Sequence, residues 1–146
     1  MTVMNPIESA LDYRSAVTAI EAILKEFPQA TIETLHHYAN GIYAREVRMP
    51  KGTIAIGKIH KTEHFCVLNG DIDVCDENGK TRFTGHALFK TPAGIKRAVF
   101  AHQDTVFTTF HAIPEASIEE LERQLVSDSY ADYLLTQNLK NGKIIP

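Results

Sequence analysis

The segment His60-Lys61-Thr62-Glu63-His64 holds the side chains of this sequence best suited to chemistry. Its two imidazoles and one carboxylate are separated by only a few residues. Apolar residues at a period of two precede the segment and a further apolar run follows it, which is typical of β-strands. Two strands that meet at this corner bring imidazole and carboxylate groups together, and such groups serve as metal ligands or as general acids and bases.

Strand parity limits which of these groups share a site. Glu63 and His64 are neighbours, so in a regular strand they point to opposite faces and only one of them joins His60. The following residues do not decide between them, because both alternate sets are apolar: Phe65 with Val67, and Cys66 with Leu68. A further ligand has to come from elsewhere. His111 and His102 are candidates near strand ends, and His36 and His37 are more remote ones.

Length and composition restrict the class of protein. A chain of 146 residues with 44% hydrophobic residues suits one globular domain, 1–146, with a core of its own. The net charge of -3 and the lack of a basic run argue against nucleic acid as a partner. We find no apolar stretch of bilayer length and no apolar signal segment, so we expect a cytoplasmic protein that binds no membrane. In that reducing compartment Cys66 and Cys75, in adjacent expected strands, are expected to be buried free thiols.

Turn residues divide the middle of the chain into about eight short strands between residues 34 and 111. We expect Asn69-Gly70 to form a hairpin turn between strands 63–68 and 71–74, because glycine tolerates positive φ. Gly85-His86 is expected to be another turn. The pattern predicts an all-β sandwich or barrel rather than alternating βαβ units.

Helices are expected on both sides of the strands. The first runs from about 6 to 27, with Pro6 at its first position and Pro28 after its end, and its apolar stripe should pack on the sheet. The segment Ser117-Ile118-Glu119-Glu120 has the capping-box pattern, which predicts that C-terminal helices begin there and extend to about 137.

Residues 42–111 resemble the cupins, which are small double-stranded β-helix jelly rolls. Glu63 lies seven residues before Gly70, as in the first cupin motif. His60 matches the second histidine of that motif if the corner is one residue shorter, and Lys58 then occupies the position of the first histidine.

The second cupin motif is matched in part. Gly85, Pro92 and Gly94 fit it with one extra residue between the first two. Arg97 stands where the family has a metal-binding histidine, and Ala101 stands where it has asparagine. The segment also resembles small cupin-like proteins of bacteria and phages whose function is uncharacterised.

The resemblance implies a divalent metal ion inside the barrel. The ligands it suggests here are His60, His64, Glu63 and His111, which suit Fe, Mn, Ni or Zn. It further implies a small polar or anionic molecule as the binding partner and a homodimer as the assembly. If the protein is an enzyme, the family allows an oxygenase, an isomerase or a lyase, and the sequence does not choose among them.

Two cations at ligand positions support an alternative without a metal. Lys58 and Arg97 repel a metal ion and donate hydrogen bonds rather than electron pairs. They suit a carboxylate or phosphate ligand, with His60 and Glu63 beside them as a general acid or base. In this alternative the protein is a ligand-binding sensor or scaffold, or a catalyst that uses Glu63, Lys58 and Arg97. A buried ion pair of Arg97 with Glu63 that only satisfies the barrel interior is the third possibility.

Overall fold

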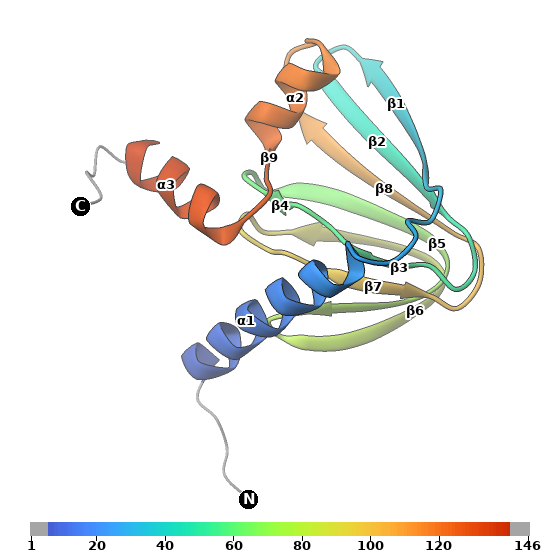
Figure 1. Ribbon diagram of the computed structural model, residues 1–146. Coiled ribbons are helices and arrows are strands. Elements are labelled where there is room, and N and C mark those ends of the chain that lie inside the picture. Colours follow the sequence, from blue (N-terminus) through green and yellow to red (C-terminus); the bar gives the residue numbers. More distant parts are fainter. Residues whose placement is uncertain (1–5, 141–146) are drawn as a thin grey trace, which may run out of the picture.

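The computed structural model describes the backbone of residues 6–140 and the side chains of residues 13–135 (Figure 1). Its elements follow one another along the chain as α1 (Pro6–Leu24), β1 (Glu33–Ala39), β2 (Ile42–Met49), β3 (Ile54–Ile56), β4 (Ile59–His60), β5 (His64–Asp76), β6 (Gly79–Thr91), β7 (Ala98–Ala101), β8 (Thr105–Ala112), α2 (Ile118–Leu125), β9 (Val126–Ser127) and α3 (Tyr130–Lys140).

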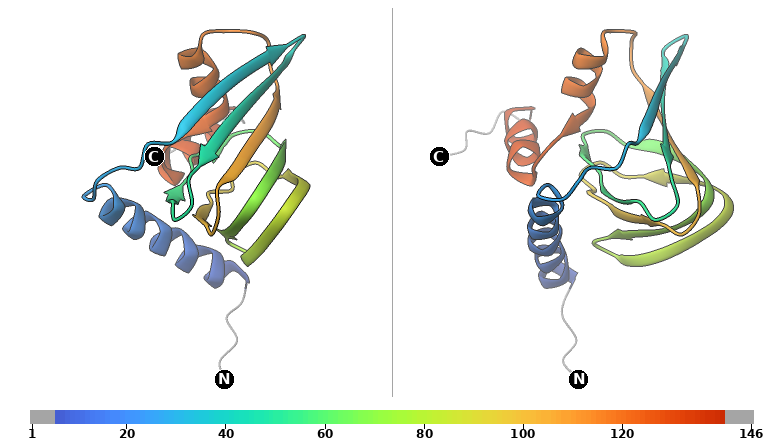
Figure 2. Two further views of the ribbon diagram at one scale, coloured as in Figure 1. Left: turned by 90° about the vertical axis from the view of Figure 1, so that its right-hand side faces the viewer. Right: turned by 45° about the vertical axis from the view of Figure 1, so that its right-hand side comes forward.

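Antiparallel strands make up the body of the molecule. Seven of them form one sheet in the order β1-β2-β8-β5-β7-β3, with β6 paired to β5, while β4 and β9 form a separate pair. The large sheet curls, and the helices lie on its open side (Figure 2). This arrangement confirms the predicted all-β jelly roll with flanking helices.

The longest strands cross both positions where we expected turns. β5 passes through Asn69-Gly70 and β6 through Gly85-His86, and the two strands pair without a break from His64↔Thr91 to Asp76↔Gly79. The expected turns at Asn69-Gly70 and Gly85-His86 are therefore wrong. Gly70 and Gly85 lie directly opposite each other, both with positive φ, within the two long strands. Glycine here permits an unusual backbone conformation inside a strand rather than a chain reversal.

Strand β5 joins the two halves of the curled sheet. Its first part, from Phe65 to Asn69, pairs with β8, and its second part, from Ile72 to Cys75, pairs with β7. The change of partner occurs at Gly70, where the start of β8 comes close to β5. A Cβ atom at Gly70 would lie 2.7 Å from the Cα of Thr105 and 2.8 Å from the carbonyl oxygen of Asp104.

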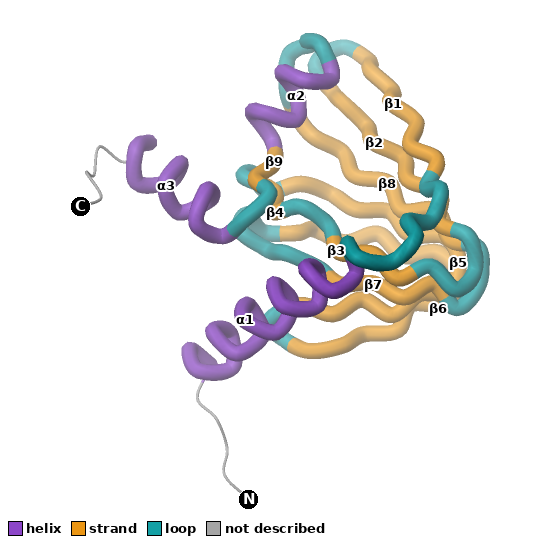
Figure 3. The backbone as a smooth tube through the Cα atoms, viewed as in Figure 1, coloured by secondary structure: helices purple, strands orange, loops and turns teal. Residues whose placement is uncertain are grey.

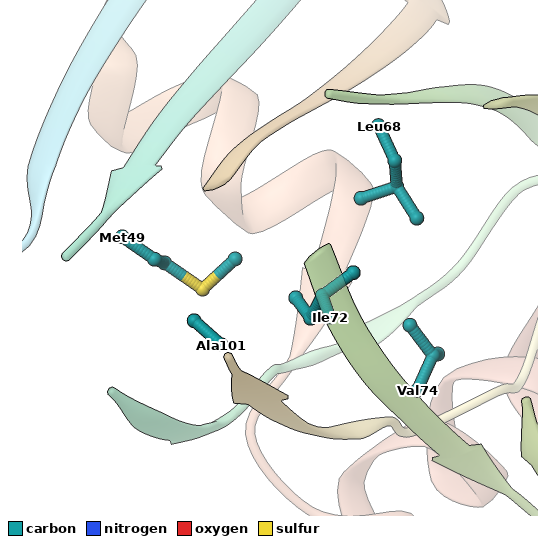
Figure 4. Packing of buried hydrophobic residues seen from close by; sticks show 5 residues of the cluster. All are labelled: Met49, Leu68, Ile72, Val74 and Ala101. Carbon is teal, nitrogen blue, oxygen red and sulfur yellow. The ribbon is translucent and has the colours of Figure 1, made fainter. Parts of the chain in front are cut away.

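Two apolar clusters fill the concave side. Met49, Leu68, Ile72, Val74 and Ala101 form the first, and their side chains converge from several strands (Figure 4). The second consists of Tyr43, Ile113, Leu121 and Leu125. It joins β2 to the helix α2.

The C-terminal segment positions one edge of the barrel. Ser117 caps α2 by accepting a hydrogen bond from the backbone N–H of Glu120 at 3.2 Å, as the capping-box pattern predicts. After α2 the chain continues into β9, which pairs with β4 at Ile59↔Ser127 and His60↔Val126. Helix α2 and β9 lie on the open side of the sheet, and α3 extends away from it (Figure 3).

Among the described side chains of α1, from Tyr13 onward, polar contacts dock the helix more than the expected apolar stripe does. Val17 is buried, but Ile20, Ile23 and Phe27 are 48–59% exposed. The hydroxyl of Tyr13 lies 2.9 Å and 2.7 Å from the carbonyl oxygens of Cys75 and Lys96. The helix ends at Leu24, before the expected boundary at Phe27.

A buried lysine ties this helix to the rest of the chain. The Nζ of Lys96, whose side chain is 2% exposed, lies 3.0 Å from Glu21 of α1 and donates at 2.9 Å to the carbonyl oxygen of Asp128. The ammonium thus connects α1 with the segment after β9. No helix in the described part of the chain is long and apolar enough to cross a bilayer.

Substitution of Gly70 by alanine tests the close approach of β5 and β8. We expect Gly70→Ala to lower the free energy of unfolding by at least about 2 kcal/mol more than Gly79→Ala does, as measured by urea denaturation. Both glycines have positive φ, but a Cβ at Gly79 meets no atom within 4 Å, so Gly79 is the matched control. Equal losses in the two variants would contradict the close approach.

Candidate functional site

Three imidazoles from three different strands meet inside the barrel. His60 comes from β4, His64 from the start of β5 and His111 from β8. The ring centroids are 4.2 Å apart for His60 and His64, 5.2 Å for His60 and His111, and 4.8 Å for His64 and His111. We call these three residues the histidine cluster.

Strand parity places His64, and not Glu63, in this cluster. His64 is 5% exposed and shares the inner face of β5 with Cys66 and Leu68. Glu63 points outward with 61% of its side chain exposed, and one of its carboxylate oxygens lies 3.5 Å from the Nζ of Lys90. The structure therefore excludes Glu63 from the buried site as a metal ligand, as a general acid or base, and as a partner of Arg97.

The hydrogen bonds of the cluster define its tautomers. The Nδ1 of His64 lies 2.9 Å from the carbonyl oxygen of Thr62, which can only accept, so Nδ1 carries the proton. The Nε2 of a neutral His64 then accepts from the Nδ1 of His60, 2.7 Å away. This leaves the Nε2 of His60 as a nitrogen with a free lone pair.

His111 completes the cluster with one unused nitrogen. Its Nε2 lies 3.0 Å from the hydroxyl oxygen of Thr109. Its Nδ1 is buried and has no hydrogen-bond partner in the described structure. A buried nitrogen without a partner is costly, and a bound ligand or ion can satisfy it.

All three imidazoles are neutral at pH 7. Burial, followed by the neighbouring charges of His64 and His111, lowers the pKa of His60 to about 2. Burial and the proximity of His64 lower the pKa of His111 to about 4. Burial also lowers the pKa of His64. Neutral imidazole is the form that binds a metal ion.

Two members of the histidine cluster, His60 and His64, border a cavity of about 290 Å³. Its walls are largely apolar, but the polar and charged groups among them include three cations and no carboxylate within the described part of the chain. The complete lining is Ile32, Thr34, Arg45, Val47, Met49, Ala55, Ile56, Gly57, Lys58, His60, His64, Cys66, Ile95, Arg97, Val99, Phe107 and Thr109.

Both cations predicted from the sequence line this cavity, and both have partners. Arg97 is only 16% exposed; it donates to the hydroxyl of Thr91 at 2.7 Å, and its Nε lies 3.7 Å from a carboxylate oxygen of Asp76. Lys58 is half exposed, with its Nζ 3.4 Å from Asp128. Arg97 is thus oriented by neighbouring groups, whereas Lys58 lies at the rim.

Arg45 was not among the predicted site residues, although it lines the same cavity. It follows the inward alternation of β2, in which Tyr43 and Met49 are buried. Its charge is close enough to contribute to the lowered pKa of both His60 and His111. The sequence did contain a signal for this position: in strand 42–48, a period of two places Arg45 on the same face as Tyr43 and Val47.

A second cavity of about 220 Å³ adjoins the first. Arg45, Ile56, Gly57 and Lys58 line both. The second cavity is also bordered by His111 and by Glu122 of α2. The two cavities therefore meet at Arg45 and Lys58.

The remaining candidates lie outside the cluster. His102 is 2.9 Å from Asp73, and His36 is 2.6 Å from the hydroxyl of Tyr43. Cys66 and Cys75 are free thiols, as predicted, but only Cys66 is buried, and both belong to β5 rather than to adjacent strands. Burial raises the pKa of the Cys66 thiol, which lies 3.2 Å from the hydroxyl of Thr91. Cys66 is therefore a protonated wall residue at pH 7.

The donor chemistry of the cluster fits a divalent metal ion. Within the described residues, no three His, Cys, Asp or Glu side chains are arranged to hold a metal as they stand. The His60–His64 hydrogen bond occupies two of the nitrogens, and a metal has to replace it. Neutral rings, the lone pair of His60 and the unused Nδ1 of His111 favour that replacement, whereas the charges of Arg45 and Arg97 oppose it.

Comparison with known proteins supports the fold. No protein-family model and no curated protein matches the chain. Among solved structures, ectoine synthase from P. lautus has a TM-score of 0.52 at 11% identity, covering 69% of this chain and 78% of that one. Salicylate 1,2-dioxygenase from Pseudoaminobacter salicylatoxidans, solved as adducts with gentisate, has a TM-score of 0.50 at 14% identity, covering 78% of this chain and 34% of that one.

A cupin domain from Bordetella pertussis is also similar, with a TM-score of 0.47 at 16% identity, covering 61% of this chain and 99% of that one. The sheet topology, the curled antiparallel strands and the likeness to ectoine synthase and to salicylate 1,2-dioxygenase show that this chain has the cupin fold.

The buried neutral imidazoles predict a specific pH dependence of stability. In metal-free protein, we expect the free energy of unfolding to fall as the pH drops from 7 to 5. The unfolded chain takes up protons near pH 6.5, whereas folded His60 and His111 stay neutral down to about pH 2 and about pH 4. Each histidine contributes up to about 1.4 kcal/mol per pH unit in that window.

Urea denaturation of chelator-treated protein at several pH values measures this slope. His111→Gln should reduce it, and His86→Gln, which changes an exposed histidine, should leave it unchanged. A slope in His111→Gln equal to that of the unsubstituted protein would show that His111 is not a buried neutral base.

Proposed function

We propose that this protein binds a small polar or anionic molecule in the barrel cavity, beside a divalent metal ion held by His60, His64 and His111. One observation carries the proposal: three neutral imidazoles converge from three strands where two cavities adjoin, with His60 and His64 on the wall of the cavity of about 290 Å³ and His111 on the wall of the second one. Imidazole ligands suit Fe, Ni, Zn or Mn, and such an ion would polarise an oxygen atom of the bound molecule as a Lewis acid.

Neighbouring groups of this chain would hold and orient the histidines that bind the metal. The carbonyl oxygen of Thr62 holds the ring of His64 through Nδ1, and the hydroxyl of Thr109 contacts the ring of His111. Partners of this kind select the tautomer and orientation of metal-binding histidines. The apolar walls formed by residues such as Val47 and Phe107 keep bulk water from the bound molecule.

The two similar enzymes support a small molecule as the ligand. These neighbours are ectoine synthase and salicylate 1,2-dioxygenase, the latter solved as adducts with gentisate. Both chemistries involve small molecules, and the same fold here contains a cavity of suitable size. If the protein is an enzyme, we expect it to act on such a molecule as an oxygenase, an isomerase or a lyase.

A metal-free binding protein is the second candidate. The observation that favours it is the set of cations Arg45, Lys58 and Arg97 around a cavity that no described carboxylate lines. Such a cavity attracts an anion without any metal, and the protein would then serve as a sensor or accessory protein.

A homodimer and a cytoplasmic location complete the proposal. Phe65 of β5 and Leu88 of β6 are more than half exposed on neighbouring strands, and a second copy of the chain would cover them. This apolar surface supports a dimer.

Metal content tests the leading proposal. We expect tag-free protein, incubated with Fe²⁺, Mn²⁺, Ni²⁺ or Zn²⁺ and desalted, to retain close to one equivalent of one of these ions in plasma mass spectrometry. His60→Ala and His64→Ala should each lose most of that metal with the melting transition preserved, because each removes one ligand. His86→Ala, which changes an exposed histidine, is the matched control and should keep it.

Two outcomes count against the metal. Full occupancy in both cluster variants would show that the ion binds elsewhere. No retained metal in the unsubstituted protein would eliminate the metal and leave the second candidate.

A further inference from the structure

We infer that Arg45 forms an anion-binding subsite at the junction of the two cavities, where it docks the carboxylate of a small ligand whose apolar body lies in the larger cavity. The inference rests on the proposed ligand cavity and names the chemical class of its ligand. It does not depend on the metal.

Arg45 is the cation in the larger cavity that has no protein partner. Among the residues that the structure describes, no side chain or carbonyl group makes a hydrogen bond or ion pair with its guanidinium. Arg97 has Thr91 and Asp76 as partners, and Lys58 has Asp128. A guanidinium removed in part from water and left without a counter-charge is available to a ligand.

The position of Arg45 places a bound anion next to the histidine cluster. In the pairing of β2 with β8, Arg45 lies directly opposite Thr109, whose hydroxyl contacts His111. Arg45 also lines the wall between the larger cavity and the smaller one. An anion on Arg45 is therefore adjacent to the groups proposed to act on the ligand.

Charge distribution selects the larger cavity for the anion. Glu122 borders the smaller cavity and repels an anion there. No described carboxylate borders the larger one, where Arg97 and Lys58 add positive charge. The anionic group thus faces the larger cavity, with Lys58 at the rim as a secondary attraction.

The cavity walls define the rest of the ligand. Away from the cations and histidines they are mostly aliphatic and aromatic, including Val47, Val99 and Phe107. At roughly 30 Å³ per water-sized group, 290 Å³ holds about ten non-hydrogen atoms. The planar fork of arginine matches a carboxylate through two parallel hydrogen bonds. A carboxylic acid with a compact apolar body, about the size of benzoate, fits both features.

Calorimetric titration with benzoate, benzamide and phenyl phosphate tests the subsite. Benzamide keeps the shape of benzoate without the charge, and phenyl phosphate distinguishes a phosphate ligand from a carboxylate. We expect the unsubstituted protein to bind benzoate at least tenfold more tightly than benzamide and more tightly than phenyl phosphate. Arg45→Gln should weaken benzoate binding at least tenfold, and Arg45→Lys, which keeps the charge but not the fork, should weaken it less.

Arg82→Gln is the matched control, because Arg82 is an exposed arginine paired with Asp71. It should bind benzoate as the unsubstituted protein does. Melting curves verify that each variant is folded. Arg45→Gln should take up at least as much Zn²⁺ as the unsubstituted protein, because the substitution removes a charge that opposes the ion. Loss of benzoate binding with retained Zn²⁺ uptake thus separates this inference from the metal proposal.

Three results would overturn the inference. The first is benzoate binding in Arg45→Gln that equals binding in the unsubstituted protein, with or without Zn²⁺. The second is an unsubstituted protein that binds benzoate no more tightly than benzamide, including no binding of either. The third is tighter binding of phenyl phosphate than of benzoate, which would assign the subsite to phosphate.

Discussion

The burial of three imidazoles in one small space is the constraint on which the site depends. Water cannot solvate these rings fully, so they remain neutral, and four of their six nitrogens find partners in one another or in nearby oxygens. The His60–His64 hydrogen bond of 2.7 Å and the contact of His64 with the Thr62 carbonyl are the result. The arrangement requires β4, β5 and β8 to meet, and the β4–β9 pairing holds the strand that carries His60.

Positive charge modifies what this cluster can bind. Arg45 and Arg97 lie close enough to contribute to the low pKa of His60, which keeps its lone pair free at neutral pH. The same charges oppose a bare divalent cation. An anionic ligand beside them would offset that repulsion, so metal and anion would favour each other's binding. The histidines and the arginines are therefore best understood as parts of one site.

Local sequence patterns predicted the fold class well, because helix caps and alternating apolar residues are encoded by neighbouring positions in the sequence. The capping-box pattern at Ser117 predicted the start of α2, and alternating apolar runs predicted the strands. Asn69-Gly70 was misinterpreted because a glycine needed for close approach of Thr105 has the same sequence signature as a turn glycine. Only the long-range pairing of β5 with β8 distinguishes the two cases.

The candidate site was predicted in part for similar reasons. His60, His64 and His111 were among the predicted ligands, and the structure brings them together. Parity alone could not choose between Glu63 and His64, since both faces of the following strand are apolar. Arg45 was missed because no motif marks it, and its importance follows from its lack of a partner, which depends on the tertiary structure.

Imidazole nitrogen NMR tests the central claim, that these three histidines form one ligand-binding cluster, most directly. In ¹⁵N-labelled, metal-free protein at pH 7, we expect neutral rings for His60, His64 and His111, with the proton of His64 on Nδ1. On titration with Zn²⁺, the nitrogen signals of all three should change together and saturate near one equivalent. Changes confined to exposed histidines such as His37 and His86, or a protonated His60 at pH 7, would contradict it.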